Sequence, residues 1–283
     1  MIICTTTNEM RAACRAARQG GKRLGLVPTM GALHEGHLSL VRAARAACDV
    51  VAASIFVNPT QFGPNEDLAK YPRSFEQDCE MLEREGVELL FAPTVEEMYP
   101  AGAVTWVTVE EMNGKLDGRS RPGHFRGVTT VVAKLFHIVE PDAAFFGQKD
   151  AAQLAIIRRM VRDINLPVEI VACPIVREAD GLAMSSRNAY LDAEQREQAL
   201  VLHRSLLRVR ALAGDGERDA AKLAAVGRAE FKGVTGVRLD YFEIVHPDTL
   251  DPVEDVSNGA LVAVAAFVGT TRLIDNILFE KTR

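Results

Sequence analysis

Two histidines three residues apart, His34 and His37, are the side chains of this sequence best suited to bind a phosphate group. They follow the apolar run 24–28 and lie at the start of an amphipathic stretch, which predicts a strand, a tight turn and the beginning of a helix. The free backbone N–H groups and positive dipole end of such a helix attract phosphates. Gly36, between the imidazoles, lets a ligand approach the backbone closely. The motif therefore favours a nucleotide triphosphate site.

Two other interpretations of the histidine turn remain open at this point. A polar loop without catalytic function has the same composition, and the pair His34-Glu35 is shared with the His-Glu-x-x-His helix of zinc metalloproteases. In that helix the histidines stand at i and i+4, whereas here they stand at i and i+3 with Gly36 between them. No third zinc ligand is evident from the sequence, so zinc is the weaker interpretation.

Polar side chains also follow two further apolar runs. Asn58 and Gln61 come after the run 50–57, where their amides are suited to orient a hydroxyl or a carboxylate. Lys149 and Asp150 come after a third run, where the ammonium can neutralise charge that develops on a phosphoryl group. Asp150 is suited either to accept hydrogen bonds from ribose hydroxyls or to cap the helix that follows it.

A later polar loop, Met184-Ser185-Ser186-Arg187, brings together two hydroxyls and a guanidinium. These groups suit a mobile phosphate clamp. Taken alone, such a loop is more typical of a turn or a helix cap. Its presence in the same chain as the histidine turn makes the phosphate interpretation the more specific one.

Short apolar runs alternate with amphipathic stretches through the first two thirds of the chain, which predicts a doubly wound α/β fold with a parallel sheet. Ligands of such sheets bind beyond the carboxyl ends of the strands, so we expect His34, Asn58 and Lys149 to converge there. The expected strands are 23–28, 50–57, 87–92, 103–109, 143–146 and 168–173, and the expected helices are 36–47, 75–85, 128–139 and 151–163.

The pattern changes after residue 175, where two helices are followed by two adjacent strands. We therefore expect a Rossmann-like domain over residues 1–175 and a smaller α+β domain over residues 176–283, with the Met-Ser-Ser-Arg loop at the start of the second. The expected elements are helices 193–212, capped by Asp192, and 219–231, then strands 237–245 and 261–268.

The composition is that of an ordinary globular chain of 283 residues, with 48% hydrophobic and 25% charged residues. The net charge of −5 (33 basic and 38 acidic residues) argues against a broad nucleic-acid-binding surface. No apolar run approaches the length of a membrane span, and the first residues lack the pattern of a secretory signal. Five scattered cysteines without a Cys-x-x-Cys pair predict reduced thiols and a cytoplasmic location.

The histidine turn and the serine loop together resemble the His-Ile-Gly-His and Lys-Met-Ser-Lys-Ser signatures of adenylate-forming nucleotidyltransferases, which include class I aminoacyl-tRNA synthetases and small cytidylyltransferases. The full set of motifs is more similar to one family, the pantothenate synthetases or pantoate–β-alanine ligases, and the similarity covers nearly the whole chain. The matching segments are Val27–His37, Phe56–Pro59, Arg121–Phe125, Arg177–Asn188 and Gly269–Asn276.

Differences from the superfamily pattern help to distinguish its members. Ala183 stands at the first lysine position of the second signature, and Ser186, Arg187 and Asn188 follow Met184-Ser185 where the signature continues with Lys-Ser. This is the pantothenate synthetase form, which argues against a tRNA synthetase. The family often has Glu before the lysine, where this chain has Gln148. We expect little consequence, because the pair Lys149-Asp150 is kept.

The resemblance implies a reaction in two steps. A carboxylate oxygen of pantoate attacks the α-phosphorus of ATP, which gives pantoyl adenylate and pyrophosphate. The amine of β-alanine then displaces AMP and gives pantothenate, a precursor of coenzyme A. The resemblance also implies Mg²⁺ held mainly by the ATP phosphates, a homodimer formed through the N-terminal domain, and no nucleic-acid or membrane partner.

Roles for individual residues follow from the same resemblance. Catalysis and phosphate binding are assigned to His34, His37, Lys149, Ser185, Ser186 and Arg187, and the rest of the ATP site to Pro28, Thr29, Met30, Gly36, Gly147, Asp150, Val176 and Met184. Pantoate is assigned to Asn58, Gln61 and Gln153. Asp78 is a candidate Mg²⁺ contact or else a surface carboxylate of a helix. His124 is expected either to contact β-alanine or simply to flank a helix.

Rival activities remain open on the sequence. A nucleotidyltransferase that makes a CDP- or NAD-type product would not depend on β-alanine. A regulatory nucleotide-binding protein would bind ATP without releasing pyrophosphate, but the retained histidines, Lys149 and serines argue against it. The polar segment 63–71 is the expected lid over the site.

Overall fold

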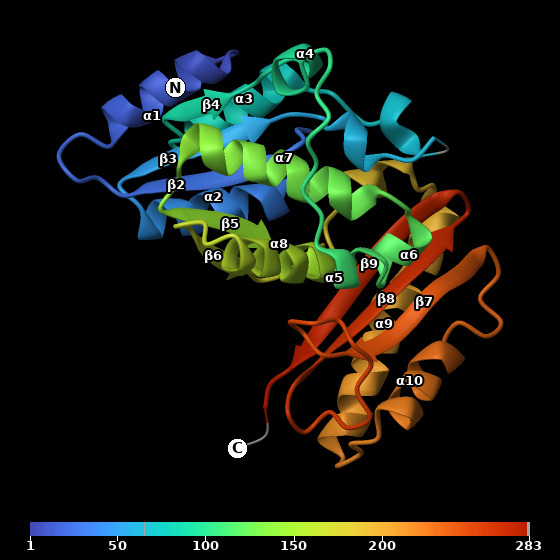
Figure 1. Ribbon diagram of the computed structural model, residues 1–283. Coiled ribbons are helices and arrows are strands. Elements are labelled where there is room, and N and C mark those ends of the chain that lie inside the picture. Colours follow the sequence, from blue (N-terminus) through green and yellow to red (C-terminus); the bar gives the residue numbers. More distant parts are fainter. Residues whose placement is uncertain (65, 282–283) are drawn as a thin grey trace.

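The first part of the chain forms a six-stranded sheet in the order β1-β4-β3-β2-β5-β6, in which every neighbouring pair is parallel (Figure 1). The computed structural model describes residues 1–64 and 66–281. The central strands are buried on both faces, which is why they appear in the sequence as nearly continuous apolar runs. The strands are β1 (Ile2–Cys4), β2 (Leu24–Thr29), β3 (Val50–Ile55), β4 (Leu89–Phe91), β5 (Ala143–Gly147) and β6 (Glu169–Cys173).

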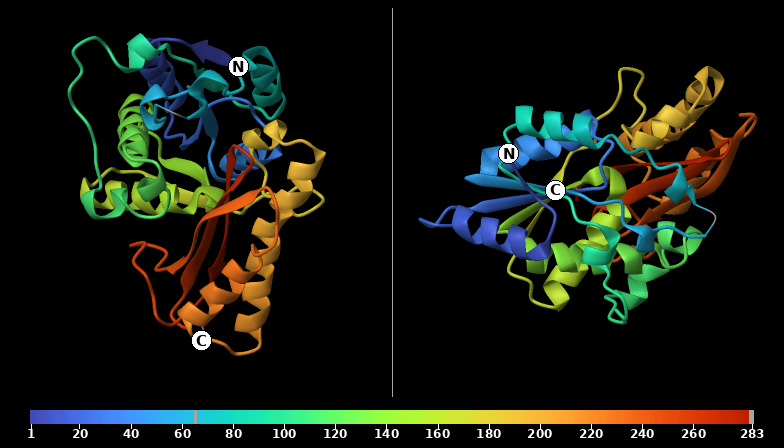
Figure 2. Two further views of the ribbon diagram at one scale, coloured as in Figure 1. Left: turned by 90° about the vertical axis from the view of Figure 1, so that its right-hand side faces the viewer. Right: turned by 90° about the horizontal axis from the view of Figure 1, so that it is seen from above.

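Helices cover both faces of this sheet (Figures 1 and 2). Successive strand residues pack on opposite sides, as Leu26 and Val27 do in β2. The expected doubly wound α/β fold is therefore confirmed. One face is covered by α1 (Thr7–Ala17), α7 (His124–Val139) and α8 (Ala151–Asp163), and the other by α2 (Glu35–Ala47) and α3 (Phe75–Arg84).

The strand order reverses direction at β2. From β2 the chain continues to β3 on one side, while β5 pairs with β2 on the other side. Such a reversal opens a crevice at the carboxyl ends of the two diverging strands, where ligands of this fold class bind. The turn that contains His34 follows β2, and Lys149 follows β5.

A second sheet is antiparallel, in the order β7-β8-β9, and it lies beside the first sheet (Figure 1). Two helices cover one of its faces, and its other face packs against α8 and the segment 112–125. The expected smaller α+β unit is present, while the boundary near residue 175 stays a prediction. The elements are α9 (Ala193–Gly214), α10 (Ala220–Ala229), β7 (Val237–Val245), β8 (Ala260–Val268) and β9 (Thr271–Phe279).

Short helical turns connect these elements. The α-helical turns are α4 (Val95–Met98), α5 (Glu110–Asn113) and α6 (Asp117–Ser120), and the 3₁₀ turns are η1 (Pro59–Gln61), η2 (Asp67–Ala69), η3 (Gln148–Asp150) and η4 (Ser186–Tyr190).

The expected strand at 103–109 is wrong. This segment is extended, but the hydroxyl of Thr129 donates to the carbonyl of Val107, and the N–H of Val107 donates to the hydroxyl of Thr130. Side chains of α7 thus take the place of a neighbouring strand. No helix within residues 1–64 and 66–281 combines the length and apolar character needed to cross a membrane.

Candidate functional site

One cavity of about 220 Å³ lies at the carboxyl edge of the parallel sheet. His34, Asn58 and Lys149, which follow three different strands, converge there as expected. Of the residues assigned to the site from the sequence, only Asp78 does not line it. Those that do are Pro28, Thr29, Met30, His34, Gly36, His37, Asn58, Gln61, Gly147, Lys149, Asp150, Gln153, Val176, Met184, Ser185, Ser186 and Arg187.

The two histidines cap the start of α2, and the backbone N–H groups that they accept from fix the tautomer of each imidazole. Nδ1 of His34 accepts a hydrogen bond from the N–H of Gly36 at 3.1 Å, and Nδ1 of His37 accepts one from the N–H of His34 at 3.3 Å. Since each Nδ1 acts as an acceptor, the proton of each neutral imidazole must be on Nε2. The turn therefore provides two Nε2–H donors.

Both imidazoles are neutral at pH 7. Burial, with a smaller effect of the nearby Lys149 ammonium, lowers the pKa of His34 to about 4. Burial, followed by the effects of His34 and Lys149, lowers the pKa of His37 to about 3. The histidines are thus hydrogen-bond donors without formal charge, and the positively charged side chains that line the cavity are Arg121, Lys149 and Arg187.

Asp78 holds the turn that precedes the histidines. Its carboxylate accepts hydrogen bonds from the N–H groups of Ala32 and Leu33 at 2.8 and 2.9 Å and from the hydroxyl of Ser74 at 3.2 Å. At 1% exposure it is not a surface carboxylate, so that alternative is wrong. A metal contact stays a prediction. No cluster of three or more potential metal-ligating side chains exists in the described part of the chain.

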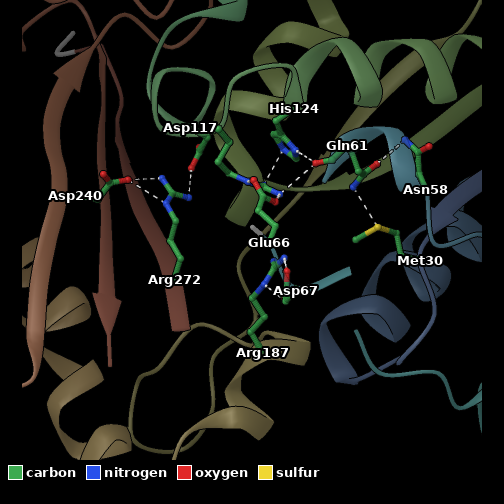
Figure 3. Close-up of polar contacts among 11 residues, drawn as sticks. Met30, Asn58, Gln61, Glu66, Asp67, Asp117, His124, Arg187, Asp240 and Arg272 are labelled. Atoms are coloured by element: carbon green, nitrogen blue, oxygen red, sulfur yellow. Dashed lines mark hydrogen bonds and ion pairs between the residues drawn. The ribbon is translucent and has the colours of Figure 1, made fainter. Parts of the chain in front are cut away.

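The side-chain amides of two residues after β3, Asn58 and Gln61, are joined by a hydrogen bond (Figure 3). Both residues line the cavity. The Nδ2 group of Asn58 donates to Oε1 of Gln61 at 3.0 Å and to the carbonyl of Gly127 at 3.1 Å, and its Oδ1 accepts from the hydroxyl of Tyr99 at 2.9 Å. Because protein neighbours use both N–H groups of Asn58, this residue orients Gln61. The Nε2 group of Gln61 contacts the sulfur of Met30 at 3.1 Å, and its second N–H is suited to a ligand.

His124, which is labelled in Figure 3, and Arg121 hold the backbone of Gln61. Nδ1 of His124 lies 2.8 Å from the Gln61 carbonyl oxygen, which can only accept, so Nδ1 carries the proton. Nε2 then accepts from Arg121 at 3.1 Å. Burial and the Arg121 charge lower the pKa of His124 to about 4, so the ring is neutral. Arg121 also reaches the Gln61 carbonyl at 3.3 Å and pairs with Glu66 at 2.5 Å.

The sequence reasoning did not assign Arg121 to the site. The available signal is the motif Arg121–Phe125, which matches the family without a role for its arginine. Both ring nitrogens of His124 are engaged by protein groups, while its expected contact with β-alanine stays a prediction.

The guanidinium of Arg187 is paired with Asp67 through two hydrogen bonds of 2.9 Å (Figure 3). Burial opposes the charge of both groups, but the hydrogen bonds between them outweigh it, so the pKa of Arg187 is raised and that of Asp67 is lowered. Asp67 therefore holds the group expected to bind phosphate. It belongs to the expected lid 63–71, of which Asn65 lies outside the described residues.

The serine loop rests on the histidine turn. The hydroxyl of Ser186 donates to the carbonyl of Ala32 at 3.2 Å, and the hydroxyl of Ser185 accepts from the N–H of Arg187 at 3.3 Å. Asp150 occupies the N-cap position of α8, but its side chain makes no capping hydrogen bond to the described residues. Its carboxylate lies 3.9 Å from the Lys149 ammonium and lines the cavity.

Comparisons with known proteins agree along the whole chain. The family model described as Pantoate-beta-alanine ligase matches residues 2–278. A pantothenate synthetase of Koribacter versatilis is 62% identical over 280 residues, covering 99% of this chain and 96% of the relative. The crystal structure of pantothenate synthetase from Thermus thermophilus is 50% identical with a TM-score of 0.93, covering 98% of this chain and 99% of its own. The pantoate–β-alanine ligase of Francisella tularensis, crystallised with "Beta-gamma ATP and Beta-alanine", is 35% identical with a TM-score of 0.80, covering 98% and 97%.

Proposed function

This chain belongs to the pantoate–β-alanine ligase family, and from that premise we propose that it condenses pantoate with β-alanine through a pantoyl adenylate, using ATP and releasing AMP and pyrophosphate. One observation supports the adenylate route above all others. His34 and His37, each with its proton on Nε2, line the same cavity as Lys149 and the serine loop, at the carboxyl edge of the sheet beside β2 and β5. Transfer at phosphorus needs this kind of positioning and charge neutralisation.

In the first step a carboxylate oxygen of pantoate forms a bond to the α-phosphorus, and the bond to the bridging oxygen of the β-phosphate breaks. The leaving pyrophosphate carries the negative charge. We assign the neutralisation of that charge to Lys149 and Arg187, and hydrogen-bond donation to the phosphate oxygens to the two histidines, Ser185 and Ser186. The second N–H of Gln61, together with Gln153, is assigned to pantoate, and Asn58 acts by orienting Gln61.

In the second step the neutral amine of β-alanine attacks the acyl carbon of the adenylate. The bond between that carbon and the phosphate oxygen breaks, AMP leaves, and the amine loses a proton. The adenosine part of ATP is assigned to Gly147, Asp150, Val176 and Met184, with Pro28, Thr29, Met30 and Gly36 beside the phosphates. Asp150 is available for ribose because its carboxylate does not cap α8.

Mg²⁺ is proposed to enter with ATP. The described residues provide no carboxylate cluster for a resident ion, and the carboxylate of Asp78 already accepts two backbone N–H groups. Bound together with ATP, the ion would be held mainly by the substrate and would help to neutralise the charge of the phosphates.

Pyrophosphate release from Mg-ATP tests the proposal, measured with D-pantoate in the presence and absence of β-alanine. We expect about one equivalent without β-alanine, as for a covalent intermediate that accumulates. Continuous turnover with AMP and pantothenate should follow when β-alanine is added. Binding of ATP without pantoate-dependent pyrophosphate release would contradict the proposal and favour a regulatory nucleotide-binding protein.

We further propose a homodimer formed through the N-terminal domain, as the family resemblance implied, and a cytoplasmic location, as the five scattered cysteines predict. Sedimentation equilibrium at micromolar concentration tests the first. A single species at the monomer mass of 30.9 kDa would contradict it.

A further inference from the structure

The turn that presents Lys149 is held by a residue of the other sheet. The Nδ2 group of Asn276, on β9, donates to the carbonyl oxygens of Gln148 and Lys149, both at 2.9 Å. Its Oδ1 accepts from Nε2 of Gln148 at 3.2 Å. These three contacts distinguish the oxygen of the amide from its nitrogen, so they fix one orientation of Asn276. At 2% exposure the amide is closed off from solvent.

The residue before it on β9 holds the other phosphate-binding segment. The carboxylate of Asp275 accepts two hydrogen bonds from Arg177, at 2.6 and 2.9 Å, and Arg177 also donates to the carbonyl of Gly181 at 3.0 Å. A bridge between Arg177 and Ala183 closes this loop directly before Met184. The N–H of Asn276 donates to the carboxylate of Asp275 at 2.7 Å, which ties the two positions together.

We propose that Asn276 is a positioning residue for Lys149, and that β9 sets the distance between the Lys149 ammonium and the serine loop through the adjacent pair Asp275-Asn276. The inference rests on the proposed function, since it takes Lys149 to act on the phosphates. Its physical basis is that an ammonium stabilises a transition state only where it is already in place when charge develops. An ammonium on a loosened turn still attracts ATP in the ground state, so the loss should fall on the rate constant rather than on binding.

The test is the rate of pantoate-dependent pyrophosphate release by Asn276→Asp and by the uncharged Asn276→Ser. The first has the same shape as the native side chain but places a carboxylate oxygen against two carbonyl oxygens, and the second removes the amide without adding charge. We expect kcat to fall at least tenfold in both variants, while KM for ATP changes by less than threefold. If a higher ATP concentration restores the rate of neither variant, the loss lies in kcat and not in ATP binding.

Ile277→Ala is the matched control, because Ile277 is the next residue of β9 and is buried in the core under α9 and α10. It should lower the melting temperature without lowering kcat at a temperature where the protein is folded. A folded Asn276→Ser with the wild-type kcat would overturn the positioning role, as would a loss of kcat in Ile277→Ala equal to that of the Asn276 variants. Absence of pyrophosphate release from the wild type would instead overturn the proposed function itself, so the two failures are distinguishable.

Discussion

Nδ1–H of His124, at the start of α7, donates a 2.8 Å hydrogen bond to the carbonyl oxygen of Gln61, at the end of η1. The two elements are in direct contact, because a Cβ on Gly127 would lie 2.4 Å from the carbonyl oxygen of Thr60. The imidazole therefore sets the position of Gln61 from a rigid helix.

His124→Asn and His124→Gln separate this role from a direct contact with substrate. The amide of Asn can take the place of Nδ1–H, whereas that of Gln reaches the place of Nε2. We expect His124→Asn to keep KM for pantoate near the wild-type value and His124→Gln to raise it about tenfold, as loss of one hydrogen bond of about 1.4 kcal/mol implies. Steady-state kinetics with varied pantoate measure this. Equal effects of both variants on KM for β-alanine would instead indicate a direct contact.

A similar pair of variants tests which ring nitrogen of His37 carries the proton. His37→Asn keeps the acceptor for the N–H of His34 but loses the Nε2–H donor, whereas His37→Gln keeps a donor near Nε2. We expect His37→Asn to lower kcat about a hundredfold, the usual effect of losing one positioned donor. His37→Gln should retain more activity even though it loses the cap. The reverse order in single-turnover pyrophosphate release would show that the cap matters more than the donor.

Asp67→Asn is predicted to lower KM for ATP several-fold. In the wild type the carboxylate of Asp67 occupies the guanidinium of Arg187, to which we assign a phosphate of ATP, so the variant should free that guanidinium for the nucleotide. Glu66→Gln is the matched control, since Glu66 pairs with Arg121 beside Gln61 and should change KM for pantoate only. Calorimetric titration with ATP measures the first effect. Weaker ATP binding by Asp67→Asn would mean that Asp67 supports the nucleotide site.

Acid should destabilise the protein through three partly buried histidines. The pKa values of His34, His37 and His124 lie at about 4, 3 and 4 in the folded state, below the ordinary value of 6.5. The unfolded chain therefore binds more protons between these values, so the stabilisation is complete above pH 6.5 and is lost as the pH falls. Each histidine contributes a slope of up to about 1.4 kcal/mol per pH unit. Urea unfolding at pH 5 and pH 7.5 measures the summed effect of the three histidines on the free energy of unfolding.

The variant His124→Asn provides the reference for that slope, because it removes one of the three titrating groups. Its free energy of unfolding should fall less steeply between pH 6.5 and 5 than that of the wild type. Parallel curves would show that His124 does not contribute.

Asp78→Asn distinguishes a structural carboxylate from a metal ligand. The variant places an amide N–H against a backbone N–H of Ala32 or Leu33, which should cost about 1–3 kcal/mol of stability. Because Asp78 lies outside the cavity, the Mg²⁺ concentration for half-maximal activity should stay unchanged. A large rise in that concentration, without loss of stability, would restore Asp78 as a magnesium contact.

The sequence was sufficient for five of the six parallel strands, all except β1, and for most of the cavity. Buried strands and amphipathic helices leave periodic patterns, and residues directly after parallel strands must gather at one edge, as His34, Asn58 and Lys149 do. The capping box formed by Thr6 and Glu9 is a sequence signal for the start of α1, a helix that the expected elements do not include.

The remaining contacts left no local pattern. Arg187 and Asp67 are 120 residues apart, and Asn276 is 127 residues from Lys149, so no periodicity connects them. The strand expected at 103–109 is wrong although its local sequence favours a strand. Valine, threonine and tryptophan are common in strands, but Val104 and Trp106 stay exposed at 83% and 43%, and no strand pairs with the segment in the described residues.

The position of Asn276 so late in the chain has a consequence during synthesis. A ribosome that has released residues 1–175 has delivered every strand of the parallel sheet, with the histidine turn and Lys149 already translated. The amide that holds the Lys149 turn, and the carboxylate that holds Arg177, are added only about a hundred residues later, at translation rates of roughly 5–20 residues per second. The strands of the parallel sheet are thus all translated several seconds before Asp275 and Asn276, so the contacts that hold Arg177 and the Lys149 turn can form only after every residue of the sheet has been made.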